Sequence, residues 1–142
     1  MQCFFIFNIP CATMHRMLPW SQGVIPLDKD LMRGSVDILI LSLIARQDTY
    51  GYEIVKNLKE SSQELYTMSE GTLYPALKRL EKKDWIESYW GDAETGGRRK
   101  YYRITAAGKQ ELAKKLNEWN KVNQLISMNS EGIPWTSNFR TT

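Results

Sequence analysis

The hydrophobic pattern changes from a helical period to a period of two between Asp84 and Thr105, and this change leaves few possible folds. From Trp85 to Trp90 the residues alternate in a pattern rich in aromatic side chains, which is typical of a half-buried strand. The turn-rich segment GDAETGG follows, and RRKYYRI has the composition of a second strand. The segment therefore predicts one β-hairpin, with helical patterns before and after it.

Three segments before the hairpin carry helical patterns. Leu31–Arg46 contains a dense apolar block, which predicts a helix buried on most of its circumference, packed against a partner chain as well as its own core. TYGYEIVKNLKESS predicts a short amphipathic helix with Asp48 or Thr49 as its N-cap. SEGTLYPALKRLEKKD predicts a third helix, capped by Ser69 and buried along a leucine face. Because Pro75 is tolerated only near a helix start, we expect the regular part of this helix to begin later than Ser69.

The segment after the hairpin predicts one long helix that pairs with another helix. Thr105 is the expected N-cap, and Gly108 is expected to weaken the first turn. Residues at spacings of four, three, four and three form a heptad seam: Leu112, Leu116, Trp119, Asn123 and Ile126. We expect residues 105–128 to be a dimerisation helix, since so short a chain hardly offers it another surface. Ile38 and Leu41 of the first helix complete the predicted dimer interface.

The two ends of the chain lack the helix and strand patterns of its middle. Residues 1–26 contain three prolines and predict an unstructured leader or a misassigned translation start. Residues 129–142 are polar without periodicity and predict a disordered tail. Cys3, Cys11 and His15 match no zinc-binding spacing, so neither a metal nor another cofactor is expected. The apolar runs are too short to span a bilayer as helices, and we expect a cytoplasmic protein.

The order of these elements predicts a mainly α fold with a small β-hairpin, a winged helix-turn-helix over residues 27–104. In such a fold the second helix of the pair enters the major groove of DNA. That helix has hydroxyls and cations on its exposed face. Its expected DNA contacts are Ser69, Thr72, Tyr74, Lys78, Arg79 and Lys82. Thr72 and Tyr74 suit base edges or sugars and the lysines suit phosphates, whereas Arg79 suits either a phosphate or a surface ion pair with nearby glutamates.

The second strand of the hairpin, the wing, is unusually basic. Successive side chains on a strand point to opposite faces, so its cations cannot all meet one partner. Arg99 and Lys100 lie near the turn and are the preferred phosphate contacts, with Arg98 and Arg103 as weaker candidates. The acidic turn itself is expected to stay out of the groove.

Three linked motifs resemble the PadR family of winged-helix bacterial transcriptional regulators: YGYEIVKNL, EGTLYPALKRLEKKDWI, and GGRRKYYRIT followed by AAG. The likeness runs from about Leu27 through Met128 and is to the small PadR subfamily, which has a single C-terminal helix. It implies a homodimer built from the first and last helices, and repression through a palindromic promoter site. It also supports DNA contacts at the matching positions Tyr50, Thr72, Tyr74, Lys78, Arg99 and Lys100.

The resemblance extends to a possible small-molecule effector. The segment NEWNKVNQLI is similar to the region in which multidrug-responsive members of the subfamily stack planar aromatic compounds between paired tryptophans at the dimer centre. This implies ligand binding at Trp119 and Asn123. The drug-binding relatives carry an acidic residue where this chain has the neutral Asn123, which leaves aromatic stacking but offers no negative charge to a cationic compound. The other reading of Trp119 is that it simply fills the helix seam.

Two other classes of function compete with DNA binding. An enzyme would need a convergent set of nucleophile, base and orienting groups, and the predicted folded region contains neither His nor Cys. We therefore expect no enzymatic activity. The second alternative is a winged helix used only for protein–protein assembly, without sequence-specific DNA binding.

Overall fold

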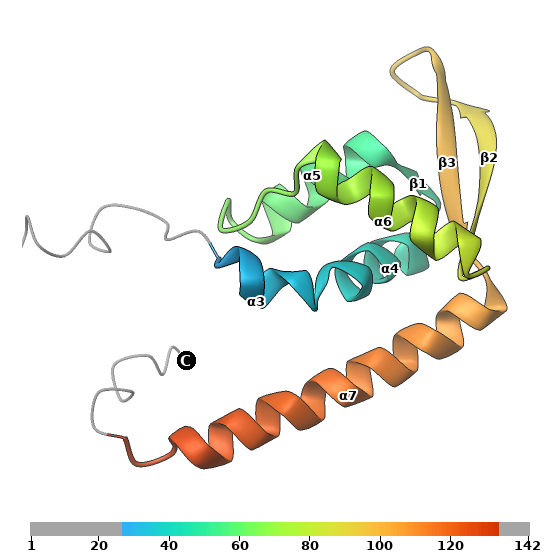
Figure 1. The fold of residues 1–142 in the computed structure, drawn as a ribbon. Coiled ribbons are helices and arrows are strands. Elements are labelled where there is room, and N and C mark those ends of the chain that lie inside the picture. Colours follow the sequence, from blue (N-terminus) through green and yellow to red (C-terminus); the bar gives the residue numbers. More distant parts are fainter. Residues whose placement is uncertain (1–26, 134–142) are drawn as a thin grey trace, which may run out of the picture.

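The computed structural model describes residues 27–133. The elements in chain order are α3 (Lys29–Arg33), α4 (Val36–Arg46), β1 (Thr49–Tyr50), α5 (Gly51–Ser61), α6 (Glu70–Lys82), β2 (Ile86–Asp92), β3 (Arg98–Ile104) and α7 (Ala106–Ser130). Figure 1 shows α4, α5 and α6 gathered in a bundle, with the β2–β3 wing rising at one end and the long α7 running along one side of the bundle. The mainly α fold with a small sheet is as the sequence predicted.

The core lies where α4, α5 and α6 meet one face of the sheet. The α4 side chains Ile40 and Leu41 have no exposed surface, and Leu80 of α6 has none either. Ile54 of α5 is also fully buried, and Tyr102 brings the wing into the same cluster. Burial of these apolar side chains is the main force that holds the three helices against the wing.

The sheet has three antiparallel strands in the order β1-β3-β2. The predicted hairpin is confirmed, with Ile86 opposite Ile104 and Asp92 opposite Arg98. The two-residue β1, which the sequence did not predict, pairs with the other side of β3 through Thr49–Tyr102 and Tyr50–Tyr101. The basic strand β3 is therefore the middle strand of the sheet and not an edge.

The predicted N-cap of α5 is wrong. Tyr50 occupies the N-cap position and makes no side-chain cap bond, because Thr49 and Tyr50 form β1. The Thr49 side chain is buried, and its hydroxyl donates to Glu53 Oε2 at 3.1 Å. Asp48 instead accepts hydrogen bonds from side chains of the wing. Strand pairing and the wing contacts thus use the groups that would have capped the helix.

Pro75 does not delay the start of α6, contrary to the sequence-based expectation. The helix begins at Glu70, directly after Ser69, whose hydroxyl accepts from the Thr72 N–H at 3.3 Å. A proline inside a helix leaves the carbonyl four residues earlier without its donor. Here Pro75 and Gly71 are both exposed, so water can satisfy that carbonyl.

The long helix α7 is capped as predicted: Thr105 Oγ1 accepts from the Gly108 N–H at 3.0 Å. The helix ends at Ser130, two residues beyond the expected Met128. None of the described helices is long and apolar enough to cross a membrane. Cys3, Cys11, His15 and the predicted leader lie outside the described residues, as does the tail from residue 134 onward.

The predicted dimer-interface residues divide into two groups. Leu41 and Leu112 belong to the core of the single chain, with exposures of 0% and 9%, so they have almost no surface to offer a partner. Within the single chain α7 packs against α4, and the expectation that Leu41 and Leu112 also form a dimer interface stays a prediction. Ile38 is partly buried against the same core. Further along α7, Leu116, Trp119 and Ile126 are 43%, 46% and 60% exposed.

Candidate nucleic-acid interface

Helix α6 presents its polar side chains outward because its leucines fill the core. Leu73, Leu77 and Leu80 are at most 1% exposed. The rest of the helix surface carries exposed residues predicted to contact DNA: Thr72, Tyr74, Lys78, Arg79 and Lys82. Within residues 27–133, Lys78 and Lys82 have no carboxylate within ion-pair distance. They are therefore available to a phosphate without breaking an existing pair.

Tyr74 is positioned by a close approach to the first residue of α5. A Cβ atom added to Gly51 would lie 2.9 Å from the Tyr74 hydroxyl oxygen and 3.2 Å from its ring carbons. A side chain there would therefore have to displace the tyrosine. Glycine at this position lets the Tyr74 ring lie over the start of α5, with the residue still 48% exposed.

A groove runs between the start of α5, Tyr74 of α6 and the wing, and we call it the wing groove. Its volume is about 860 Å³. Four residues predicted to contact DNA line it: Tyr50, Tyr74, Arg99 and Lys100. Lys56 adds a third cation, and Glu53 is the one carboxylate in the lining. The fold thus gathers side chains from three elements into a cationic, aromatic groove.

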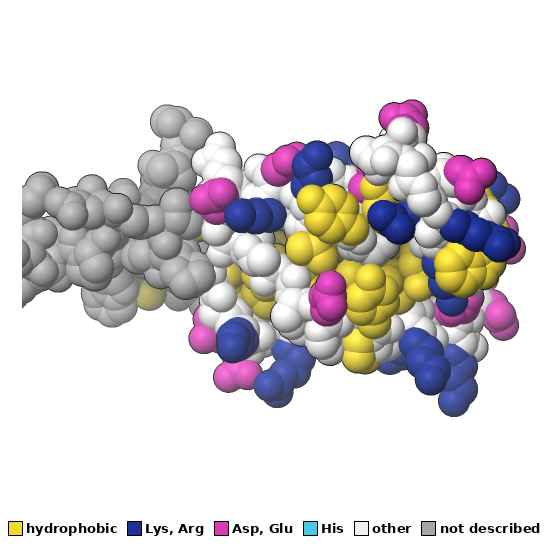
Figure 2. All heavy atoms as spheres, turned by 90° about the horizontal axis from the view of Figure 1, so that it is seen from above, with side chains coloured by type: hydrophobic (Ala, Val, Ile, Leu, Met, Phe, Trp, Pro, Cys, Tyr) yellow, Lys and Arg dark blue, Asp and Glu magenta, His cyan; other side chains and the backbone are white. Residues whose placement is uncertain are grey.

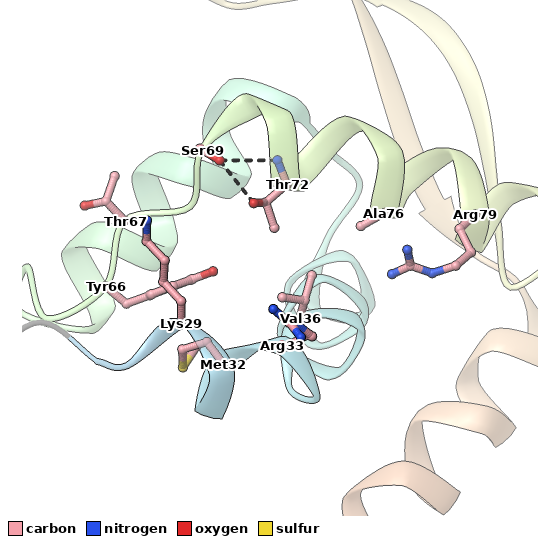
Figure 3. A pocket seen from close by; sticks show the side chains of 10 residues that line it. All are labelled: Lys29, Met32, Arg33, Val36, Tyr66, Thr67, Ser69, Thr72, Ala76 and Arg79. Carbon is pink, nitrogen blue, oxygen red and sulfur yellow. Dashed lines mark hydrogen bonds between the residues drawn. The ribbon is translucent and has the colours of Figure 1, made fainter.

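The remaining candidates on α6 lie elsewhere. Ser69, Thr72 and Arg79 line a second pocket, on the side of α6 that faces α3 and α4 (Figure 3). Arg79 donates from Nη2 to Asp37 Oδ1 of α4 at 2.5 Å. The structure contains an ion pair of Arg79, but its partner is Asp37 of α4 and not one of the nearby glutamates that the sequence suggested.

The wing cations are in different environments. Arg98 lies over the Trp90 ring with its guanidinium carbon 5.4 Å from the centroid. Lys100 pairs with Glu81 of α6 at 3.5 Å and lies 5.5 Å from the centroid of the Tyr102 ring. Arg99 has no carboxylate partner among the described residues, and its Nη1 donates only to the Arg98 carbonyl, at 3.4 Å. Arg99 is therefore the wing cation that is least engaged with the protein.

Arg103, the other weaker wing candidate, is held by Asp48. Its Nε and Nη2 both lie 2.9 Å from Asp48 Oδ2, and the Tyr89 hydroxyl donates to the same oxygen at 2.7 Å. Burial raises the pKa of Asp48, but the hydrogen bonds from Tyr89 and Arg103 and the Arg103 charge outweigh it and leave that pKa below its ordinary value. The same bond to Asp48 raises the pKa of Tyr89. This cluster ties the residue before β1 to both wing strands.

The sequence reasoning missed several residues of the wing groove, among them Tyr52 and Lys56. Tyr52 is 70% exposed, and Lys56 lies one helical turn further along α5. Both lie on the polar side of an amphipathic pattern, so only their spacing of four residues distinguished them from ordinary surface residues. Figure 2 looks down on this face, where Lys and Arg side chains lie around exposed hydrophobic side chains, with acidic groups both among them and at the edge.

The predicted ligand-binding residues lie on the far part of α7. The Trp119 indole N–H donates to Ser35 Oγ, just before α4, at 3.3 Å. Asn123 is exposed one turn further along the helix. No cluster of metal-binding side chains occurs among residues 27–133.

The order of the helices and the three-stranded sheet define a winged helix-turn-helix fold. Residues 40–114 match the model of the transcriptional regulator PadR-like family. The chain belongs to that family, as the motifs in the sequence indicated.

Individual relatives agree with this assignment. A transcriptional regulator from Clostridium thermocellum is 46% identical in sequence and superimposes with a TM-score of 0.66, over 72% of this chain and 96% of the regulator. Protein X of Lysinibacillus sphaericus is 44% identical over 104 residues, which are 73% of this chain and 95% of that protein. The negative transcriptional regulator PadR of Bacillus subtilis is 32% identical over 73 residues, 51% of this chain but only 40% of that regulator.

Proposed function

We propose that this PadR-like regulator represses transcription by binding a promoter site on double-stranded DNA as a homodimer. In this proposal residues 27–104 form the DNA-binding domain. The N-terminal part of α6 enters the major groove, and Thr72 and Tyr74 read base edges. Lys78, Lys82, Arg99 and Lys100 contact phosphates, which position the protein on the duplex. Repression is the mode of action named for the negative regulator PadR, to which the chain is similar.

The wing groove carries this proposal. It lies between α6, the helix proposed to enter the major groove, and the wing. Its lining contains three cations and one carboxylate. Tyr50 and Tyr74, which carry aromatic hydroxyls, line the same groove as those cations. Phosphate oxygens accept hydrogen bonds from hydroxyls and from cations alike, so the groove suits a DNA backbone that passes between wing and helix.

The exposed part of α7 supports the homodimer. Apolar side chains continue along this helix with 43–60% exposure, including Leu116, Val122, Leu125 and Ile126. A helix with so much uncovered apolar surface is stabilised when a second helix covers it. A two-fold dimer presents two copies of α6 and therefore predicts a palindromic site with one half-site for each copy.

A planar aromatic effector at Trp119 and Asn123 is the finer part of the proposal. Trp119 is 46% exposed, so its ring can stack on a flat ligand between two subunits. Such a ligand would release the protein from DNA by favouring a different arrangement of the two subunits. Titration with planar aromatic compounds at micromolar levels should quench Trp119 fluorescence, and a Trp119→Phe variant should lose that response. An unchanged Trp119 signal would contradict effector binding there.

The experiment that tests the main proposal is selection of bound fragments from the source genome, followed by footprinting of the best one. We expect a protected palindrome with one half-site per α6. The alternative function, a winged helix used only for protein–protein assembly, predicts no enriched fragment. Loss of the footprint in Arg99→Ala, but not in Lys114→Ala on exposed α7, would assign the contact to the wing.

A further inference from the structure

The pocket between α3, α4 and α6 is separate from the wing groove and from the Trp119 site. We call it the α3–α6 pocket, and Figure 3 shows its lining. Its volume is about 610 Å³, which lies in the range of small-molecule sites. None of its lining residues belongs to α7 or to the wing.

The floor of this pocket is apolar. Met32, Val36 and Ala76 line it with exposures of 8%, 7% and 2%, and the half-buried Tyr66 forms one wall. Burial raises the pKa of Tyr66, so its hydroxyl stays protonated and can donate a hydrogen bond. A ligand that reached this floor would need an apolar part to replace the water there.

The rim of the pocket is cationic. Lys29 and Arg33 come from α3 and Arg79 from α6, and the lining contains no carboxylate. The Asp30 partner of Arg33 lies 3.1 Å away, but both side chains are 82% exposed, and such pairs are weak in water. Arg79 uses Nη2 for Asp37, which leaves its other donors for a ligand. In Figure 3 its side chain reaches toward the part of the pocket that Arg33 and Val36 form.

We propose that the α3–α6 pocket binds a small amphipathic anion, in which a carboxylate, sulfonate or phosphate group is attached to an apolar ring. The arginines hold the anionic group, since a guanidinium matches the geometry of such groups. The ring lies on Met32, Val36 and Ala76. A neutral compound of the same shape loses the contacts of the rim, and a purely inorganic anion loses those of the floor.

The pocket also touches the start of the recognition helix. Ser69 and Thr72 line it, and their hydroxyl oxygens are 3.1 Å apart. An anion bound beside them competes with DNA for the same hydroxyls and adds negative charge near the phosphates. It therefore weakens DNA binding, and DNA weakens anion binding by the same factor. This coupling rests on the proposed function, whereas binding of the anion itself does not.

Methyl NMR of the full chain tests the site without DNA. The chain has six methionines, of which Met32 lies in the pocket floor, Met68 is 2% exposed and Met128 on α7 is 73% exposed. The probe is 8-anilinonaphthalene-1-sulfonate, and the matched neutral probe is N-phenyl-1-naphthylamine. We expect saturable shifts of the Met32 methyl signal with the sulfonate. The neutral compound should bind at least about tenfold more weakly, because it cannot form a charge-assisted hydrogen bond with the rim.

Two charge reversals complete the test. Arg33→Glu should weaken sulfonate binding about tenfold, whereas Arg46→Glu, at the other end of α4 and outside the pocket, should not. Both side chains are exposed, and an unmoved Met68 signal verifies the fold. Shifts of Met128 without Met32, equal affinity for the neutral probe, or unchanged binding by Arg33→Glu would each overturn the proposal. If the sulfonate binds at Met32 but leaves DNA affinity unchanged, the site stands and only its coupling to DNA fails.

Discussion

Gly108 in the first turn of α7 lies directly against the carbonyl of Trp85, at the start of the wing. A Cβ atom at Gly108 would be 1.9 Å from that oxygen, far inside contact distance. The same carbonyl accepts from the Thr105 N–H at 3.0 Å, and the Thr105 hydroxyl donates to the Asp84 carbonyl at 2.6 Å. The start of α7 is therefore pinned to the base of the wing, and the glycine permits the close approach.

Gly108→Ala should destabilise the protein, although alanine is by about 1 kcal/mol the better helix former. The added methyl group must push α7 away from the wing, so we expect a loss of about 3 kcal/mol in the free energy of unfolding. Thermal unfolding at one fixed protein concentration measures this loss. The matched control is Gly34→Ala, where an added Cβ meets no atom within 4 Å and φ is −75°. An unchanged melting temperature in Gly108→Ala would contradict the close approach of Gly108 to the Trp85 carbonyl.

Asp48→Asn should loosen the connection between β1 and the wing. At neutral pH we expect a loss of about 1 kcal/mol, kept small by solvent screening of the exposed pair. The folded-state pKa of Asp48 is depressed, so its contribution is present above the ordinary value and disappears as the pH falls through the folded value.

The difference between native protein and Asp48→Asn should therefore be constant from about pH 7 to pH 5 and shrink below about pH 4. Urea unfolding at a series of pH values measures it. Asp92→Asn, at the exposed end of β2, is the control and should show no such convergence. A difference that stays constant down to pH 3 would show that the Asp48 charge contributes nothing.

Thr72→Ala and Tyr74→Phe should relax sequence preference more than they weaken binding. A lost base contact reduces discrimination by about 1–3 kcal/mol at the affected position. Phenylalanine keeps the ring over Gly51 and removes only the hydroxyl, so the fold is preserved. Competition between the selected site and single-base variants measures the effect. Thr67→Ala, an exposed hydroxyl before α6, should change nothing, and an equal effect there would remove the case for specific readout.

Ile126→Asp should shift the protein toward monomer. The residue is 60% exposed in the single chain, so the aspartate is solvated in a monomer but must be buried against a partner helix in a dimer. Sedimentation at several concentrations should show a dissociation constant raised at least about 100-fold. Asn120→Asp, also exposed on α7, adds the same charge and should leave assembly largely intact. A native-like dimer in Ile126→Asp would place the interface elsewhere.

The sequence predicted the elements with strong periodicity. The leucine face of α6, the hairpin and the Thr105 cap are all local patterns, and each appears in the structure. The two-residue β1 has no period of its own and forms only because β3 offers it a free side. A long-range pair such as Asp48–Arg103 joins residues 55 positions apart, so no local sequence pattern predicts it.

The candidate site was predicted as a set of residues but not as a surface. Tyr50, Tyr74, Arg99 and Lys100 converge on one groove, whereas Ser69 and Arg79 face another pocket. The side of α6 on which a residue lies depends on how α6 sits against α4 and the wing, which its own sequence does not determine. The sequence of α4 did not place Leu41 in the core of the single chain either, since a helix that is apolar on most sides does not reveal which side faces its own core.

The salt dependence of binding to the selected genomic fragment tests the central claim most directly. The logarithm of the affinity should fall linearly with the logarithm of salt concentration, by about 0.9 for each phosphate neutralised. Lys78→Ala and Arg99→Ala should each make that slope less steep by about 0.9, the contribution of one phosphate contact. Lys114→Ala on α7 should leave the slope unchanged. Neither Lys78 nor Arg99 has an ion-pair partner within residues 27–133, so neither change breaks a pair there. A slope near zero, or slopes unaffected by both variants, would contradict DNA binding through α6 and the wing.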